Sequence, residues 1–222
     1  MYSVPFIEAV IFDCDGVLVD SEEACCLLCA QDAREVGMFV SDADAVPTFS
    51  GMALPMIQQK IEHHSGVTLG PYWVKNMQAR FIEAMKKGVK PMVGVEAMLE
   101  AIQALGVPMH VASNSSQDEL RVKLTLTGLE KYFTGRIHSA RDMRAPKPKP
   151  DVYLHAATMQ NVDPSHCLVL EDSDLGAKAA IDAGMTCALF RKGHKPMPQW
   201  QKLIRIEKLS DFPALVAQML KK

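Results

Sequence analysis

The chain has 222 residues, of which 48% are hydrophobic and 23% are charged, a composition typical of a globular protein. This length suits one large α/β domain, or a core domain that carries an inserted subdomain. The formal net charge of -2 gives no reason to expect a nucleic acid or a membrane surface as partner. We find no apolar run of the roughly 18 residues that a membrane span needs, and no secretory signal, so we expect a cytoplasmic protein. We also expect a monomer.

The cysteines do not form a recognisable metal-binding pattern. Cys25, Cys26 and Cys29 cluster in one predicted helix, but no second pair of cysteines or histidines follows at metal-ligand spacing. We therefore expect buried free thiols that pack as small apolar side chains in a reducing compartment.

Short apolar runs mark the strands of a parallel sheet that is buried on both faces. The runs cover residues 8–12, 107–113, 136–139, 167–170 and 187–190. Helical patterns accompany them at residues 95–105, 120–129, 152–159 and 175–183, and a last helix is expected near 213–220. This alternation predicts an α/β fold, a Rossmann-like doubly wound parallel sheet.

The segment from Ser21 to about Lys90 departs from this alternation. It has helical patterns throughout, with breaks expected near Val46–Pro47, between residues 51 and 55, and between residues 66 and 71. We therefore predict a helical cap domain at residues 16–90, inserted into a core domain that consists of residues 1–15 and 91–222.

Polar side chains follow the predicted strands where their carboxyl ends meet, which is the ligand-binding edge of an open α/β sheet. The acids there are Asp13, Asp15, Glu171 and Asp172. Carboxylates that converge in this way raise each other's pKa unless a cation offsets their charge. Because an all-oxygen ligand set suits Mg²⁺ better than Zn²⁺, we expect a bound Mg²⁺.

A lysine and a hydroxyl group complete the set of polar groups at this edge. Lys147 would place a fixed cation opposite the carboxylates, and Ser113 would offer a hydroxyl donor for phosphate. Lys149 is the competing lysine, and we expect it to face solvent. A carboxylate nucleophile, a metal, a lysine and a hydroxyl are the groups that a phosphoryl transfer needs.

The segments that carry these residues resemble, in order and spacing, the motifs of the haloacid dehalogenase superfamily. They are Asp-Cys-Asp-Gly-Val-Leu-Val-Asp-Ser at residues 13–21, Val-Ala-Ser-Asn at 111–114, Lys-Pro-Lys-Pro-Asp-Val-Tyr at 147–153, and the run from Leu170 to Met185. The helical insertion after the first motif resembles the cap of the β-phosphoglucomutase-like subgroup. The resemblance covers nearly the whole chain.

This resemblance implies catalytic roles for the motif residues. Asp13 would attack phosphorus and become an aspartyl phosphate. Asp15 would protonate the leaving oxygen and then activate water. Ser113, Asn114 and Lys147 would bind the phosphate oxygens, and Lys147 would also neutralise the carboxylate of Asp13.

The resemblance also implies the metal ligands. Asp13, Asp172 and the backbone carbonyl of Asp15 would bind Mg²⁺, with Glu171 as a further ligand or as a partner of the ligands. An alternative interpretation is that Glu171, Asp172 and Ser173 only cap the following helix, where acidic residues favour the helix dipole. The presence of Asp13 and Asp15 at the same edge favours the metal site.

The cap is expected to select the substrate. Residues 49–54 look like the cap loop that faces the core in this subgroup, and Gly51 and Lys75 are candidate substrate contacts. Lys75 and Arg80 could equally form the solvated face of a cap helix. Mutases of the subgroup carry an arginine just after the loop glycine and a histidine early in the first cap helix, whereas this chain has Cys25 in that region and no arginine after Gly51.

The sequence thus leads to a Mg²⁺-dependent phosphatase for a small phosphate monoester. The resemblance suggests a sugar phosphate or a phosphorylated sugar acid such as 6-phosphogluconate. Two alternatives stay open: a β-phosphoglucomutase-like isomerase, and a non-enzymatic receiver-like module that only carries a phosphoaspartate. Asp15 and the cap weigh against the receiver.

Overall fold

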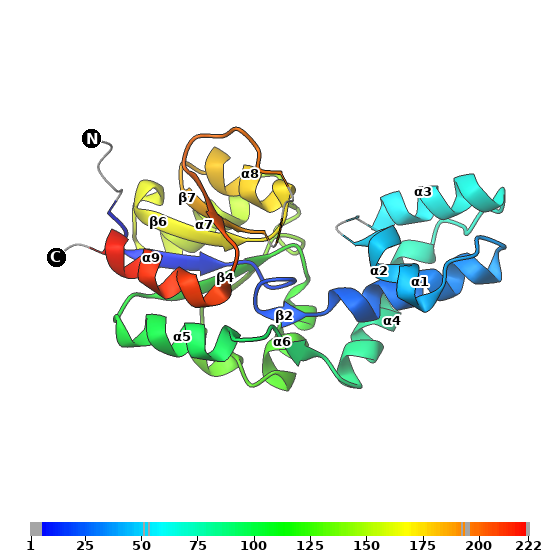
Figure 1. Cartoon of the computed structure of the whole chain (residues 1–222), viewed down its shortest axis with the longest axis horizontal. Coiled ribbons are helices and arrows are strands. Elements are labelled where there is room, and N and C mark those ends of the chain that lie inside the picture. The colour runs from blue at the N-terminus through cyan, green and yellow to red at the C-terminus, as the bar shows by residue number, and fades with distance from the viewer. Residues whose placement is uncertain (1–5, 51, 53, 192, 194–195, 221–222) are drawn as a thin grey trace. The chain divides into compact units, whose positions relative to one another are not determined.

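The computed structural model describes residues 6–50, 52, 54–191, 193 and 196–220. The chain forms two compact units, a core unit of Met1–Val19 with Pro91–Lys222 and a helical unit of Asp20–Lys90 (Figure 1). The chain passes from one unit to the other through the short strands β2 (Val19–Asp20) and β3 (Lys90–Pro91), which pair with each other. These changes of unit lie after residues 19 and 90, whereas the predicted domain boundaries follow residues 15 and 90.

A parallel sheet with the strand order β5-β4-β1-β6-β7-β8 forms the centre of the core unit. Its strands are β1 (Ala9–Phe12), β4 (Met109–Ser113), β5 (Ile137–Ser139), β6 (Cys167–Glu171), β7 (Thr186–Phe190) and β8 (Leu203–Ile206). The predicted α/β, doubly wound parallel sheet is therefore confirmed. Strand β8 was not predicted, because this edge strand is only partly buried and Arg205 interrupts its apolar run.

Helices cover both faces of this sheet (Figure 1). They are α5 (Val95–Ala104), α6 (Gln117–Leu126), α7 (Asp151–Gln160), α8 (Asp174–Asp182) and α9 (Phe212–Met219), with 3₁₀ turns η1 (Glu130–Tyr132), η2 (Pro164–His166) and η3 (Leu209–Asp211). Neighbouring residues of β1 point to opposite faces. Ile11 packs into a buried cluster with residues of α7 and α8. Phe12 lies on the other face, where its ring is 5.9 Å from the ring of Phe212, in an edge-on contact.

The register of the central strands brings their carboxyl ends to one edge of the sheet. Phe12, the last residue of β1, pairs with Val111 of β4 and with Leu170 of β6. The backbone N–H of Asp13 still donates to the carbonyl of Leu170 at 2.9 Å. Asp13 therefore leaves the sheet next to Glu171, the last residue of β6.

The helical unit consists of α1 (Glu22–Glu35), α2 (Asp42–Phe49), α3 (Leu54–Ser65) and α4 (Trp73–Lys86). The expected break near Val46–Pro47 is wrong, because α2 continues through Pro47 and ends at Phe49. A proline inside a helix removes one backbone hydrogen bond. Burial of Ala45 and Phe49 in the core of the unit offsets this loss.

A buried carboxylate connects two helices of the helical unit. Asp32 on α1 accepts a hydrogen bond from Trp73 Nε1 at 2.7 Å and another from Arg80 Nη1 at 2.5 Å, both on α4. Asp32 is 8% exposed, and the two donors provide the partners that a buried charge requires. Arg80 is thus engaged inside its own unit.

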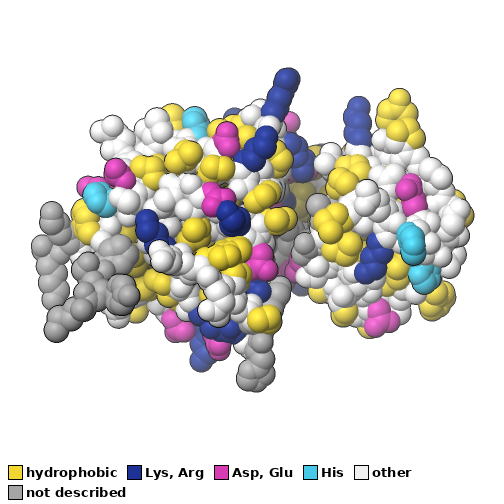
Figure 2. Space-filling model, turned by 90° about the horizontal axis from the view of Figure 1, so that it is seen from above, with side chains coloured by type: hydrophobic (Ala, Val, Ile, Leu, Met, Phe, Trp, Pro, Cys, Tyr) yellow, Lys and Arg dark blue, Asp and Glu magenta, His cyan; other side chains and the backbone are white. Residues whose placement is uncertain are grey.

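The surface agrees with the small net charge of the chain. On the face shown in Figure 2, acidic and basic side chains are interspersed on both units. Among the described helices, none combines the length and the apolar character that crossing a bilayer requires.

The cysteines are free thiols, all of them buried except the half-buried Cys25, which confirms the expected buried thiols at every position but that one.

Candidate active site

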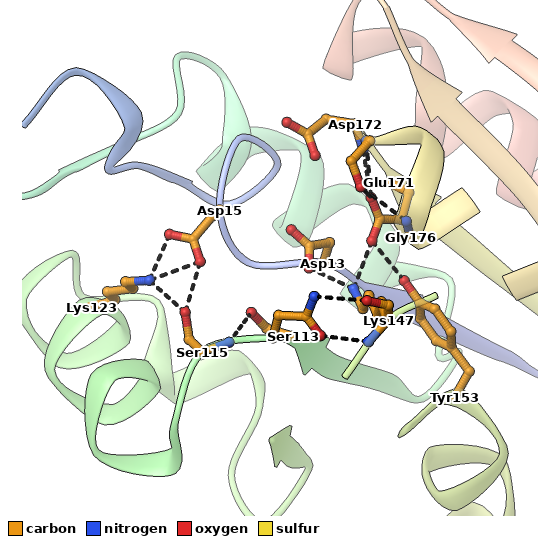
Figure 3. A network of polar contacts seen from close by, with 12 residues as sticks. Asp13, Asp15, Ser113, Ser115, Lys123, Lys147, Tyr153, Glu171, Asp172 and Gly176 are labelled. Carbon is orange, nitrogen blue, oxygen red and sulfur yellow. Dashed lines mark hydrogen bonds and ion pairs between the residues drawn. The ribbon is translucent and has the colours of Figure 1, made fainter. Parts of the chain in front are cut away.

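Lys147 joins the ends of two neighbouring strands. Its Nζ donates to Asp13 Oδ1 at 2.7 Å and to Glu171 Oε1 at 2.6 Å (Figure 3). The Lys147 side chain is 3% exposed, and its ammonium lies 4.7 Å from the centre of the Tyr153 ring. Burial alone would lower the pKa of Lys147, but the carboxylates of Asp13 and Glu171 outweigh it and raise that pKa above its ordinary value. Lys147 therefore stays a cation inside the site.

Glu171 uses both carboxylate oxygens within the core unit. Oε1 accepts hydrogen bonds from Lys147 and, at 2.9 Å, from the hydroxyl of Tyr153. Oε2 accepts from the backbone N–H groups of Asp172 and Ser173 at 3.1 and 3.0 Å, and from Ser173 Oγ at 2.9 Å. Burial would raise the pKa of Glu171, yet Lys147 and the two hydrogen bonds from Ser173 hold it below its ordinary value. Glu171 is thus an ionised anchor for the loop that leads into α8.

Two glycines allow the acidic residues to approach the neighbouring backbone closely. A Cβ on Gly16 would overlap the carboxylate of Asp172, and a Cβ on Gly176 would overlap the carboxylate of Glu171. Gly16 also has a φ of +79°, which side chains other than that of glycine rarely adopt. Glycine is therefore required in the loop after β1 and at the start of α8, so that these two carboxylates can lie against the backbone.

The acids have the composition of a hard-cation site. Asp13, Glu171 and Asp172 each offer one carboxylate oxygen, and these atoms lie within 4.8 Å of one another. The pKa of Asp13 is raised to about 7, mainly because the carboxyl group is buried. The charge of Lys147 opposes this increase, and the charges of Glu171 and Asp15 add to it. The raised pKa of Asp13 thus comes mainly from loss of hydration, and the charge of Lys147 does not fully offset this loss together with the repulsion from the two neighbouring carboxylates. A divalent cation fits this all-oxygen donor set and would restore the ionised form of Asp13 at neutral pH.

Asp15 has partners of its own, one on α6 and one in the loop before it. Lys123 Nζ, from α6, donates to Asp15 Oδ1 at 2.6 Å and to Oδ2 at 2.8 Å. The hydroxyl of Ser115 donates to Asp15 Oδ2 at 2.9 Å, and Lys123 also donates to that hydroxyl at 2.8 Å. Figure 3 shows Asp15 turned toward Lys123 and Ser115, and Asp13 toward Lys147.

Ser113 and Asn114, at the end of β4, hold the backbone of the neighbouring loops through hydrogen bonds. Ser113, buried at the strand end, accepts a hydrogen bond from the backbone N–H of Ser115 at 3.1 Å. Asn114 Oδ1 accepts a hydrogen bond from the backbone N–H of Lys147 at 2.7 Å. The side chain of Asn114, a predicted phosphate contact, therefore orients the segment that carries Lys147.

The core residues that the sequence analysis named converge at one sheet edge (Figure 3). They are Asp13, Asp15, Ser113, Asn114, Lys147, Glu171 and Asp172. Of the two substrate candidates in the helical unit, Lys75 is an exposed residue of α4, and Gly51 lies outside the described residues. Lys149 is exposed, as expected.

Three further residues contact the acidic residues, although no role was predicted for them: Ser115, Lys123 and Tyr153. Lys123 had a visible signal, because it lies between Leu120 and Leu124 on the apolar side of a predicted helix. A lysine on such a stripe is buried only when it has a partner. Its partner, however, is Asp15, far away in the chain, and helical periodicity carries no information about that contact.

Comparison with known proteins identifies the family. The haloacid dehalogenase-like hydrolase family matches residues 10–190. A 6-phosphogluconate phosphatase of Escherichia coli is 32% identical over 212 residues, with 94% of each chain covered. A phosphorylated carbohydrates phosphatase of Thermotoga maritima is 29% identical, with 81% of this chain and 82% of the relative covered.

A solved structure shows the same architecture. It is a conserved haloacid dehalogenase-like protein of unknown function from Agrobacterium tumefaciens, which is 32% identical, with a TM-score of 0.81. The alignment covers 96% of this chain and 99% of that protein. With the strand order, the acidic edge and the matching family in agreement, this chain is an enzyme of the haloacid dehalogenase-like hydrolase family.

Proposed function

We propose that this enzyme is a Mg²⁺-dependent phosphatase that hydrolyses a small phosphorylated metabolite through an aspartyl phosphate on Asp13. One observation carries the proposal: buried Lys147 bridges Asp13 and Glu171, directly beside Asp172. This places a carboxylate, a fixed cation and an acidic cluster where a phosphate group could lie. Phosphoryl transfer depends on such positioning and charge stabilisation.

The first half of the reaction transfers the phosphoryl group to the enzyme. A carboxylate oxygen of Asp13 attacks phosphorus, and the bond between phosphorus and the ester oxygen breaks. Asp15 gives its proton to the departing oxygen, which leaves as an alcohol. Lys147 and Ser113 hold the phosphoryl oxygens during this step, and the ionised Asp15 is left ready to act as a base.

The second half releases phosphate. Asp15 takes a proton from a water molecule while the water oxygen attacks phosphorus. The bond between phosphorus and Asp13 breaks, so inorganic phosphate leaves and the carboxylate of Asp13 is regenerated. Asp15 ends the cycle protonated, as it began.

The residues that would hold Mg²⁺ are Asp13, Asp172 and the backbone carbonyl of Asp15, with Glu171 as a further ligand or as their support. When bound, Mg²⁺ supplies positive charge next to the phosphoryl oxygens. The oxygens of Glu171 already accept bonds from Lys147, Tyr153 and the start of α8, which favours the supporting role.

The proposed substrate class is a sugar phosphate or a phosphorylated sugar acid. Two relatives carry the names 6-phosphogluconate phosphatase and phosphorylated carbohydrates phosphatase, and their similarity extends over both units of this chain. We propose that the helical unit, Asp20–Lys90, selects among such substrates as a cap, with Lys75 and Gly51 as candidate contacts. A monomeric state and a cytoplasmic location remain predictions from the sequence.

The test is a screen of phosphorylated sugars and sugar acids for release of inorganic phosphate, with Mg²⁺ and with excess EDTA. We expect turnover that needs Mg²⁺ and that falls by more than about 10³-fold in Asp13→Asn. Asp163→Asn is the matched control, because Asp163 is an exposed aspartate of the same unit that caps η2. It should keep the wild-type rate.

Three results would contradict the proposal. Full activity of Asp13→Asn would show that Asp13 is not the nucleophile. A rearranged sugar phosphate without free phosphate would identify a mutase, the isomerase alternative, while slow decay of a phosphoaspartate without turnover would identify a receiver-like module.

A further inference from the structure

Lys123 places its ammonium on both carboxylate oxygens of Asp15, at 2.6 and 2.8 Å. Ser115 closes a triangle with them, since its hydroxyl accepts from Lys123 and donates to Asp15. Figure 3 shows this group beside the cluster of Asp13, Lys147 and Glu171. Each group has its own lysine, so the two carboxylates of the first loop are held independently.

The burial of the two partners is unequal. The side chain of Lys123 is 6% exposed, whereas that of Asp15 is 37% exposed. Asp15 could therefore stay hydrated without a lysine, but Lys123 pays a large desolvation cost that only its pairing offsets. An apolar residue would suit the position between the buried Leu120 and Leu124 at least as well. Helix packing thus gives no reason for a lysine here, whereas orientation of Asp15 does.

We propose that Lys123, together with Ser115, is a positioning residue that fixes the carboxylate of Asp15 for proton transfer. This inference rests on the proposed function and adds to it a residue on α6. The hydrogen bonds of Lys123 go to Asp15 and Ser115, and those of Lys147 go to Asp13 and Glu171. Loss of Lys123 should therefore slow proton transfer and leave phosphate binding nearly unchanged.

The two half-reactions respond differently to a misplaced Asp15. With a sugar phosphate, the first half needs a proton for the leaving oxygen and the second half needs a base for water, so both slow down. With p-nitrophenyl phosphate, the leaving group departs without a proton, and only the second half needs Asp15. The enzyme should then accumulate as the aspartyl phosphate.

The experiment is rapid-mixing kinetics of the full chain with Mg²⁺ and p-nitrophenyl phosphate. In Lys123→Met we expect a burst of nitrophenolate that approaches one equivalent per enzyme and is no slower than wild-type turnover. A steady state about 10²-fold below the wild-type rate should follow. A purely structural defect would reduce the active fraction and the burst together, and would not trap phosphoenzyme.

Two further variants complete the design. Ser115→Ala removes one corner of the triangle and should give the same burst with a smaller loss of steady-state rate, which keeps the test valid if Lys123→Met fails to fold. Lys131→Met is the matched control, because Lys131 is an exposed lysine of the same unit that pairs with Glu96 at 3.0 Å. It should behave like the wild type.

A Lys123→Met enzyme with wild-type turnover and no burst overturns the inference, as does a loss of burst and steady state in equal proportion in both Lys123→Met and Ser115→Ala. Failure of the proposed function looks different. In that case the wild type itself releases no phosphate, or Asp13→Asn retains activity.

Discussion

Gly16 lies so close to Asp172 that a methyl group on its α-carbon would overlap the Asp172 carboxylate. The substitution Gly16→Ala should therefore displace Asp172 and weaken Mg²⁺ binding by about 10- to 100-fold, as loss of a supporting contact does at other metal sites. The measurement is phosphatase activity as a function of Mg²⁺ concentration. Gly135→Ala is the matched control, with a similar φ of +72° but nothing within 4 Å of the added carbon. Equal Mg²⁺ affinity in both variants would show that the overlap is relieved without cost.

Tyr153 supports Glu171 through one hydrogen bond of 2.9 Å in a fully buried position. Tyr153→Phe removes the hydroxyl and little else, so one oxygen of Glu171 loses a donor. We expect a loss of roughly 10-fold in activity or Mg²⁺ affinity, within the range for partners of metal ligands. Tyr132→Phe removes the hydroxyl of another buried tyrosine of the same unit, whose ring centre lies 4.9 Å from Lys131 Nζ, and it should leave both quantities unchanged. Wild-type kinetics of Tyr153→Phe would mean that Lys147 alone holds Oε1.

A pair of buried histidines should make the core unit sensitive to acid. His110 Nδ1 and His138 Nε2 lie 3.0 Å apart between β4 and β5, and His155 packs edge-on against His138. Burial, reinforced by the charges of His110 and His155, lowers the pKa of His138 to about 4. The unfolded chain therefore binds this proton first, and stability is lost as pH falls from about 6.5 toward 4.

His138→Gln should reduce the dependence of the melting temperature on pH in that window. The comparison uses the difference between variant and wild type at each pH, so that other titrating groups cancel. His64→Gln, at an exposed position of α3, should follow the wild-type curve. Parallel curves for His138→Gln and the wild type would contradict the prediction.

The buried Asp32 should contribute to the stability of the helical unit. Asp32→Ala leaves the indole N–H of Trp73 without its acceptor and removes the partner of Arg80. We expect a loss of about 1–3 kcal/mol in the free energy of unfolding. Asp42→Ala breaks a surface pair with Arg34 and should cost less than about 1 kcal/mol. Urea unfolding followed by Trp73 fluorescence in a Trp200→Phe background separates the two, and equal losses would argue against a special role of the buried pair.

Local sequence patterns predicted those helices and strands whose apolar pattern continues along their whole length. The run before Asp13 is apolar at every position, and its burial on both faces makes β1 recognisable. The edge strand β8 was missed because half-exposed strands have no such run, and Pro47 was taken as a break because packing around Phe49 cannot be read from its neighbours.

The acidic site was predictable for a related reason. Its residues follow strand ends, and parallel strands bring those ends together. The supporting residues obey no such rule, since Lys123 reaches Asp15 across the fold from the middle of a helix. Contacts of this kind depend on how α6 lies beside the first loop, which no local pattern specifies.

The chain leaves the core unit after Val19 and returns at Pro91, and the described acids and lysines of the site all belong to the core unit. The residues of the site and the intervening helices thus lie in separate segments of the chain. Variation can accumulate in residues 20–90 without displacing a reacting group. Under the selecting role that we propose for the helical unit, an exchange of that segment between relatives should change the substrate preference and keep the reacting groups in place.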